Sequence, residues 1–171
     1  MILAIDLASK KTGYAFFNND NENINLVKSG IIETPHNDAL YRQGKMNMIL
    51  IKNFKEAFDI FWMNNVNFFN KTHHVVIESP IYNKNPKVTI TLSFCHGVFL
   101  SFLSNFDIEV HYIDNKKWKN IYYGNSNASK EDIIEYVESQ YNIKVISNDE
   151  SDAIGIGNAF LLQKKEEEVL L

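Results

Sequence analysis

The first seventeen residues, MILAIDLASKKTGYAFF (residues 1–17), decide the fold of this chain. Five apolar residues lead to Asp6, a pattern typical of a buried strand over Ile2–Leu7. A polar turn is predicted over Ser9–Gly13, and a second apolar and aromatic strand over Tyr14–Phe17. An ionised carboxylate among apolar neighbours is costly unless it is paired or binds a cation. Asp6 is therefore the first candidate site residue.

The rest of the chain predicts a mixed sheet with helices on both faces. A third strand at Leu26–Glu33 completes an antiparallel meander, and later strands alternate with helices. Further strands are expected at His74–Glu78 and Ile108–Ile113, and helices at Ala39–Asn64, Pro86–Ser104, residues 129–141 and Ser147–Lys165. Asp114–Asn127 is expected to be a polar loop. The fold class is α/β, with a mixed five-stranded sheet and the element order βββαβαβαα.

Length and composition indicate one folded domain. The chain has 171 residues, of which 45% are hydrophobic and 22% charged, ordinary values for a globular protein. We expect a single domain over residues 1–171, with a frayed charged tail at 164–171. The net charge of −4 offers no overall attraction to nucleic acid, so any DNA-binding surface must come from local clusters of lysine.

Cysteine content and hydropathy indicate the cellular compartment in which the protein is expected. The single cysteine, Cys95, allows no intramolecular disulfide and no thiolate cluster, which fits a reducing cytoplasm. The apolar run before Asp6 lacks the features of a signal peptide. No stretch approaches the roughly 20 apolar residues of a membrane span. We therefore expect a cytoplasmic protein without a membrane partner.

Three further carboxylates join Asp6 in a pattern that suggests a metal site. Glu78 ends the apolar strand at His74–Glu78, and Asp149 and Asp152 share one face at the start of a helix. Acids from separate elements suit Mg²⁺, which takes oxygen ligands, and two such ions can clamp a phosphoryl displacement. We therefore expect two Mg²⁺ per site, with Mn²⁺ as a substitute, held by the catalytic residues Asp6, Glu78, Asp149 and Asp152.

Other polar residues have simpler interpretations. Glu150 is three residues after Ser147 and is expected to be its capping-box partner rather than a metal ligand. His73 and His74 precede the strand of Glu78 and mark the transition from loop to strand. We expect no histidine or cysteine cluster that competes with the acidic site.

The order of these motifs resembles the RuvC-like Holliday-junction resolvases of the RNase H-like superfamily. Asp6 followed by Thr12-Gly13-Tyr14 is similar to the first motif of that family. Val76-Ile-Glu78 resembles its strand with the second acid, and Asp149-Glu-Ser-Asp152-Ala153 resembles its final acidic motif. Ser29-Gly-Ile-Ile-Glu-Thr34 resembles its third strand. The matches extend over nearly the whole chain in the family order.

The resemblance implies a fold and an activity. It implies an RNase H-like domain that cleaves phosphodiester bonds in branched DNA and resolves four-way junctions by paired nicks. It also implies a homodimer, for which the apolar helix at Pro86–Ser104 could supply the interface or could instead be packed in the core. Small size and composition fit an enzyme of phage type.

Lysines near the predicted site would meet the phosphate backbone of DNA. Some follow Asp6 or Glu78 directly, and others lie between the last strand and the helix at 129–141. The candidates are Lys10, Lys11, Lys84, Lys87, Lys116, Lys117, Lys119 and Lys130. Resemblance to the family favours Lys117 and Lys130, and it makes Tyr82 the candidate aromatic wedge in a junction. Trp118 is expected to pack its segment down.

Three alternatives stay open. An RNase H-like nuclease acting on RNA, on a hybrid or on another branched nucleic acid would need the same acids. A non-catalytic junction-binding protein would need the DNA-binding residues alone. A phosphotransferase with an Asp in its first strand would need a second Gly-rich phosphate loop, which this sequence lacks.

Overall fold

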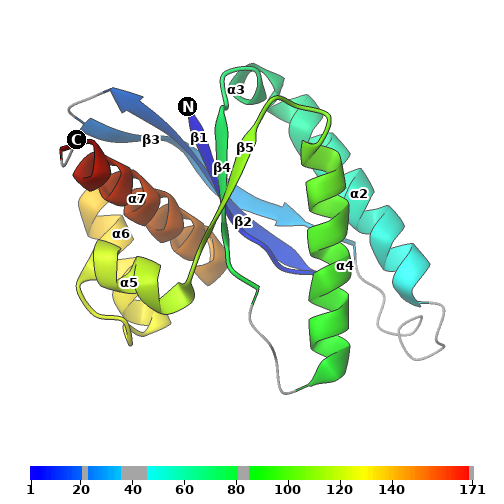
Figure 1. The fold of residues 1–171 in the computed structure, drawn as a ribbon. Helices are drawn as coiled ribbons and strands as arrows, with labels where there is room; N and C mark the ends of the chain where they lie inside the picture. The colour runs from blue at the N-terminus through cyan, green and yellow to red at the C-terminus, as the bar shows by residue number, and fades with distance from the viewer. Residues whose placement is uncertain (21–22, 36–45, 81–84, 170–171) are drawn as a thin grey trace.

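A central five-stranded sheet organises the structure. The computed structural model describes residues 1–20, 23–35, 46–80 and 85–169. The strands lie in the order β3 (Asn23–Glu33), β2 (Lys11–Asp20), β1 (Ile2–Asp6), β4 (His74–Glu78) and β5 (Glu109–Ile113). β1, β2 and β3 pair antiparallel, whereas β1, β4 and β5 pair parallel (Figure 1). The predicted mixed sheet is therefore confirmed.

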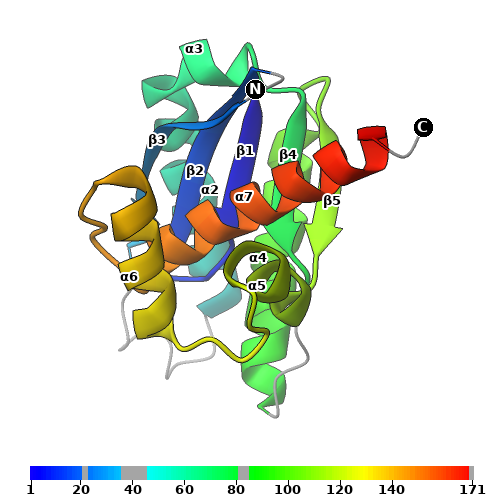
Figure 2. The same cartoon turned by 90° about the vertical axis from the view of Figure 1, so that its left-hand side faces the viewer.

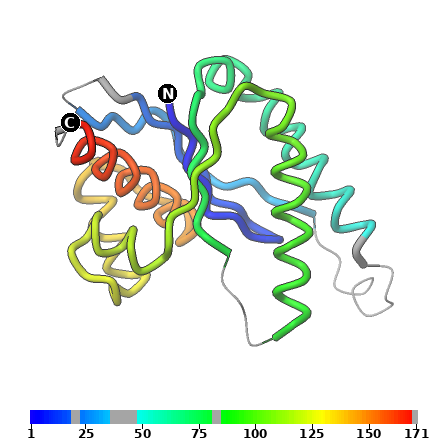
Figure 3. The backbone as a smooth tube through the Cα atoms, in the orientation of Figure 1, coloured from blue at the N-terminus to red at the C-terminus, as the bar shows by residue number. Residues whose placement is uncertain are grey.

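Helices cover both faces of this sheet, also as predicted. One face carries α2 (Met46–Asn64) and α4 (Pro86–Leu103), which lie side by side, and the short α3 (Val66–Phe69) follows α2 (Figure 3). The other face carries α5 (Asn115–Tyr123), α6 (Lys130–Tyr141) and α7 (Asn148–Val169). Figure 2 shows α7 crossing the sheet diagonally, with α5 and α6 outside it. α3 and α5 are additions to the predicted order.

Alternation along β1 separates the two cores and orients the first acid. Leu3 and Ile5 pack in the core beneath α2 and α4, whereas Ile2 and Ala4 pack in the core beneath α7. Successive strand residues point to opposite faces of a sheet. Asp6 therefore lies on the face covered by α7.

Small residues let α7 lie close to the sheet, as its sequence predicts. A β-carbon on Gly157 would lie 2.2 Å from the ring of Phe17, and one on Gly155 would lie 2.6 Å from the indole of Trp118. Both distances are far below van der Waals contact. Gly157 thus sets the height of α7 above the strands, and Gly155 lets α5 pack closely against α7.

The segment after β5 corrects the prediction of a polar loop over Asp114–Asn127. It forms α5, because Asp114 caps its start by accepting hydrogen bonds from the backbone N–H groups of Lys116 and Lys117. Gly124 ends it in the left-handed conformation, with φ of 83°. The helix is short and rich in lysine, so its single buried face is not evident from the sequence pattern.

The ends of other strands and helices also differ from the prediction. β2 begins at Lys11, so Thr12 and Gly13 lie within the strand instead of in a turn. α7 continues to Val169, beyond the predicted end at Lys165. Gln163 Nε2 donates to Glu167 Oε1 at 2.9 Å within this last part, a pairing that supports the helix. α2 is described from Met46, and the predicted start at Ala39 lies outside the described residues.

The apolar residues of α4 are partly buried and partly exposed. Cys95 and Phe99 are buried, whereas Val88, Ile90 and Leu100 are exposed. In the described part of the chain, α4 alone is long and apolar enough for a membrane span by length and composition, where the sequence predicted no such stretch. Core helices of globular proteins meet the same criteria, and the buried face of α4 packs against α2.

Candidate functional site

The start of α7 lies directly against the strand pair that carries Asp6. Asp6 is opposite Gly13 in the β1–β2 ladder. A β-carbon on Gly13 would lie 1.7 Å from the carbonyl oxygen of Asp149. Because Gly13 has no side chain, the first turn of α7 occupies that space. The sequence places Gly13 in a motif but does not predict that it makes room for the first turn of α7.

Glu150 and Ser147 fix the first turn of α7. Ser147 Oγ accepts from the backbone N–H of Glu150 at 3.2 Å, as expected for a capping residue. Glu150 Oε2 accepts from the backbone N–H of Ile146 at 2.7 Å, one residue earlier than in a standard capping box. Glu150 Oε1 also accepts from the Ser29 hydroxyl of β3 at 2.7 Å. Glu150 is therefore buried for a structural purpose, as predicted.

Glu78 is held by two donors from α5. It lies at the end of β4, next to β1, where Ile77 is opposite Ile5. Its Oε2 accepts from Asn115 Nδ2 at 2.9 Å and from Trp118 Nε1 at 2.8 Å. Trp118 is fully buried, as its expected packing role requires. Neither hydrogen bond was predicted, because both donors belong to the segment that was expected to be a loop.

Two of the four acids have raised pKa values, in part because of the charges of the others. Burial raises the pKa of Asp6 well above its usual range, and the charges of Asp152, Glu78 and Asp149 raise it further. Burial also raises the pKa of Asp152 to about 6, and the charges of Glu78 and Asp149 contribute to the increase. Two strand ends and one helix start therefore bring the four predicted acids into one neighbourhood.

This neighbourhood has the chemistry of a divalent cation site. Its donors are carboxylate oxygens, the ligands that hard cations prefer. Asp152 Oδ1 is buried and has no hydrogen-bond partner in the described part of the chain. No three of these acids, all within the described residues, bring their oxygens within 4.8 Å of one another. The β1–β4 register, the contact of Gly13 with the start of α7 and the raised pKa values of Asp6 and Asp152 indicate that the four acids lie near one another.

Comparison with known proteins identifies the family. The sequence profile of the Lactococcus phage M3 protein family matches residues 1–166. The chain belongs to this family. As a member of the Lactococcus phage M3 protein family, it fits the phage type that the sequence suggested.

Curated relatives of this family member are junction nucleases. The crossover junction endodeoxyribonuclease RuvC of Brachyspira hyodysenteriae is 29% identical over 163 residues, which cover 92% of this chain and 91% of the relative. The RuvC of Wigglesworthia glossinidia brevipalpis is 28% identical over 169 residues, which cover 97% of each chain. The likeness therefore extends over nearly the full length of both proteins.

Solved structures confirm the RNase H-like fold of RuvC. Thermus thermophilus RuvC in complex with a Holliday junction substrate superposes with a TM-score of 0.74 and 11% identity, covering 96% of this chain and 95% of that one. The fowlpox virus Holliday junction resolvase superposes with a TM-score of 0.54 and 15% identity, covering 95% and 98%. At these identities the likeness establishes the fold of this Lactococcus phage M3 family member.

Two of the predicted lysines lie close enough to act on the acids. The charges of Lys119 and Lys130 lower the pKa of Asp152, and Lys130 also lowers that of Asp6. Lys119 Nζ donates to the carbonyl oxygen of Ala128 at 2.9 Å, whereas Lys130 is exposed at the start of α6. The sequence favoured Lys117 and Lys130; the structure brings Lys130 and Lys119 to the acids and leaves Lys117 exposed on α5.

The other candidate DNA-binding residues that the structure describes are exposed and belong to separate elements. Lys10 and Lys11 are exposed after β1, and Lys11 Nζ lies 3.4 Å from Glu33 Oε1. Exposed lysines also begin two helices, with Lys87 on α4 and Lys116 on α5. Tyr82 and Lys84 lie outside the described residues.

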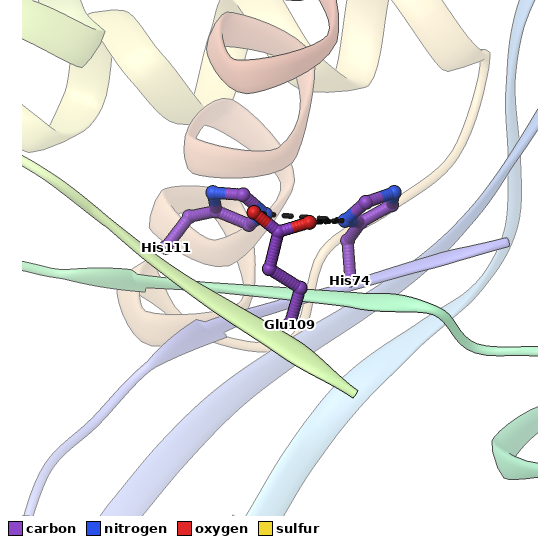
Figure 4. A group of neighbouring side chains, drawn as sticks. All are labelled: His74, Glu109 and His111. Carbon is purple, nitrogen blue, oxygen red and sulfur yellow. Dashed lines mark hydrogen bonds and ion pairs between the residues drawn. The ribbon is translucent and has the colours of Figure 1, made fainter. Parts of the chain in front are cut away.

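Histidines gather at the opposite end of β4, contrary to the expectation of no histidine cluster. His74 begins the strand that Glu78 ends. Its ring meets His111 and Glu109 of β5 (Figure 4). The sequence would predict this cluster only if β4 and β5 were known to be neighbours. The Glu109-x-His111 spacing could then be matched with His74 of the adjacent strand.

Proposed function

We propose that this chain is a Mg²⁺-dependent endonuclease that resolves four-way DNA junctions by paired nicks. The observation that carries the proposal is that the ends of β1 and β4 and the start of α7 bring four carboxylates close enough for the charges of the other three to raise the pKa of Asp6. Its relatives over nearly the full length are named crossover junction endodeoxyribonucleases, which supports the substrate class.

Asp6, Glu78, Asp149 and Asp152 would hold two Mg²⁺ ions, for which Mn²⁺ would substitute. Such a metal pair activates a water molecule and stabilises the leaving oxygen of a phosphodiester. Asn115 and Trp118 orient the Glu78 carboxylate through hydrogen bonds to one of its oxygens. Glu78 Oε1 accepts neither of these hydrogen bonds, and its direction is fixed because the side chain is held.

Basic residues around the acids would receive the DNA backbone. The charges of Lys119 and Lys130 lower the pKa of Asp152. These two lysines are therefore the first candidates for contact with the phosphates near the cleaved bond. We assign further DNA contacts to Lys10, Lys11, Lys87, Lys116 and Lys117, together with Tyr82 and Lys84. Because the net charge is −4, these local cations must provide the attraction.

A homodimer would supply the second cut. The exposed apolar side chains of α4 form the proposed contact between two copies. Two identical sites related by a twofold axis would address the two opposed strands of a four-way junction.

Cleavage assays on a set of DNA and RNA substrates test the proposed function. The full-length chain is incubated in Mg²⁺ with a four-way junction, a flap, an RNA–DNA hybrid and single-stranded DNA. Paired nicks in the junction are expected, with weaker cleavage of the others. Preference for the hybrid would instead support a nuclease for RNA-containing substrates.

Variants of the acids test the site. Asp6→Asn and Glu78→Gln should abolish cleavage, while binding to the junction persists. Asp107→Asn and Glu135→Gln change exposed acids away from the site and serve as matched controls. Normal cleavage by both site variants would refute the metal-site assignment.

A further inference from the structure

His74, Glu109 and His111 bring three metal-ligating atoms together, away from the proposed nuclease site. His74 begins β4, and Glu109 and His111 lie on the same face of the neighbouring β5. Figure 4 shows the two rings pointing toward each other with the carboxylate between them. Glu78 is four residues along β4 from His74, so the two sites are about 13 Å apart along the strand.

The spacing of the ligand atoms of these three residues fits a tetrahedral metal ion, with each imidazole close to a different oxygen of Glu109. His74 Nδ1 lies 3.1 Å from His111 Nε2 and 3.3 Å from Glu109 Oε2, and His111 Nε2 lies 3.6 Å from Glu109 Oε1. Tetrahedral Zn²⁺, with bonds of about 2.0–2.2 Å to nitrogen and oxygen, holds its ligand atoms about 3.3–3.5 Å apart. The three observed separations lie around this value.

Phe160 of α7 packs against both imidazoles of the cluster, with its ring centroid 6.4 Å from that of His74. The ring of Phe160 on α7 packs against His111 at a centroid distance of 4.7 Å and fixes that ring.

Access to the cluster is open on one side. The side chains of His74 and His111 are 28% and 21% exposed, and that of Glu109 is 65% exposed. Two imidazoles and one carboxylate therefore meet at the surface, within reach of solvent. Lys164 is the nearby cation that a bound metal would repel, and its ammonium lies over Phe160 at 5.3 Å.

We propose that His74, Glu109 and His111 bind one Zn²⁺ ion at a site separate from the four acids. Two imidazoles with one carboxylate are a donor set that Zn²⁺ accepts with a water in the fourth position. Imidazole ligands favour Zn²⁺ over Mg²⁺, so the two sites would select different metals. The ion would link β4 to β5 at the sheet edge beneath the C-terminal half of α7.

Metal titration of the full-length Asp6→Asn/Asp152→Asn variant tests this site, because those changes weaken competition from the acids. Calorimetric titration with Zn²⁺ should show one equivalent bound, and Zn²⁺ should raise the melting temperature. Co²⁺ should give the intense visible absorption of a four-coordinate ion. His111→Asn and Glu109→Gln, added to this background, should each weaken Zn²⁺ binding at least about tenfold.

Controls separate a built site from general histidine binding. His73→Asn removes an exposed neighbouring histidine and should leave Zn²⁺ affinity and the Co²⁺ spectrum unchanged. Glu109→Gln keeps the size of an exposed side chain, so it tests the site even if a histidine variant fails to fold. Equal Zn²⁺ affinity in the parent, His111→Asn and Glu109→Gln proteins would overturn the proposal, as would no stoichiometric binding in the parent.

Discussion

Gly13 and Asp149 approach so closely that a β-carbon on Gly13 would lie 1.7 Å from the carbonyl oxygen of Asp149. Gly13 is also the residue opposite Asp6 in the β1–β2 ladder. One missing side chain therefore lets a helix bring two acids to a third on a strand. The proposed metal site depends on this backbone contact as much as on the carboxylates.

Gly13→Ala should displace the first turn of α7. The added methyl group cannot fit without movement of backbone, which commonly costs about 1–3 kcal/mol in a packed core. We expect lower stability in urea unfolding and loss of Mg²⁺-dependent cleavage by at least about 100-fold. Gly97→Ala is the matched control, because a β-carbon there would meet no atom within 4 Å. It should preserve stability or raise it by about 1 kcal/mol. Full activity in Gly13→Ala would contradict the proposed packing role.

Trp118→Phe and Asn115→Ala should each release one hydrogen bond from Glu78 Oε2. Hydrogen bonds to charged groups contribute about 1.5–3 kcal/mol, so cleavage should fall about 10- to 100-fold. The Mg²⁺ concentration for half-maximal activity should increase, because the carboxylate loses its orientation. Measurement of rate against Mg²⁺ concentration checks this. Asn120→Ala alters an exposed asparagine of the same helix and should behave as wild type. An unchanged Mg²⁺ requirement in Trp118→Phe would argue against a positioning role.

Asp152→Asn should stabilise the metal-free protein at neutral pH. The pKa of Asp152 is raised from 3.8 to about 6 by burial, so its ionisation opposes folding. Its favourable contribution is present below pH 3.8 and is lost as the pH rises through about 6. In urea with a chelator, the variant should gain about 1–3 kcal/mol over wild type near pH 8 and much less near pH 4.5. Asp107→Asn should show no such pH-dependent gain. A gain of equal size at both pH values would exclude this cause.

Lys130→Ala should weaken both DNA binding and catalysis. Lys130 is exposed, and its charge lowers the pKa of Asp6 and Asp152. Loss of one phosphate contact should reduce the slope of log affinity against log salt by about one. Fluorescence anisotropy with a labelled junction measures that slope. Lys55→Ala removes a lysine of α2 on the other face of the sheet, and its slope should match wild type. If Lys55→Ala reduced the slope as much, the effect would be one of net charge.

Ile90→Glu or Leu100→Glu on α4 should disrupt the proposed homodimer. Both side chains are exposed in the single chain, so the change should not unfold it. Sedimentation should show a dimer for wild type and a monomer for the variants, and junctions should receive single nicks. Ile60→Glu, at an exposed position of α2, should remain dimeric. A monomeric wild-type protein at assay concentration would refute the dimer proposal.

Sequence alone predicted the mixed sheet and singled out the four acids. Local pattern is sufficient for this, because an apolar run that ends in Asp6 or Glu78 is both a strand and an isolated carboxylate. The Asp149-x-x-Asp152 spacing likewise places two acids on one helical face. Helix spacing in Pro86–Ser104 predicted α4 to within a residue.

Tertiary structure decided how these acids are held and which other residues meet. Asn115 and Trp118 reach Glu78 across 37 and 40 residues of chain, in a helix whose lysines made it resemble a loop. His74 meets Glu109 and His111 only because β4 and β5 are adjacent parallel strands. A periodic pattern reports the burial of one element at a time, whereas a ligand set depends on register between elements that are distant in sequence. For that physical reason the acidic site could be proposed before the fold was known, and the histidine cluster could not.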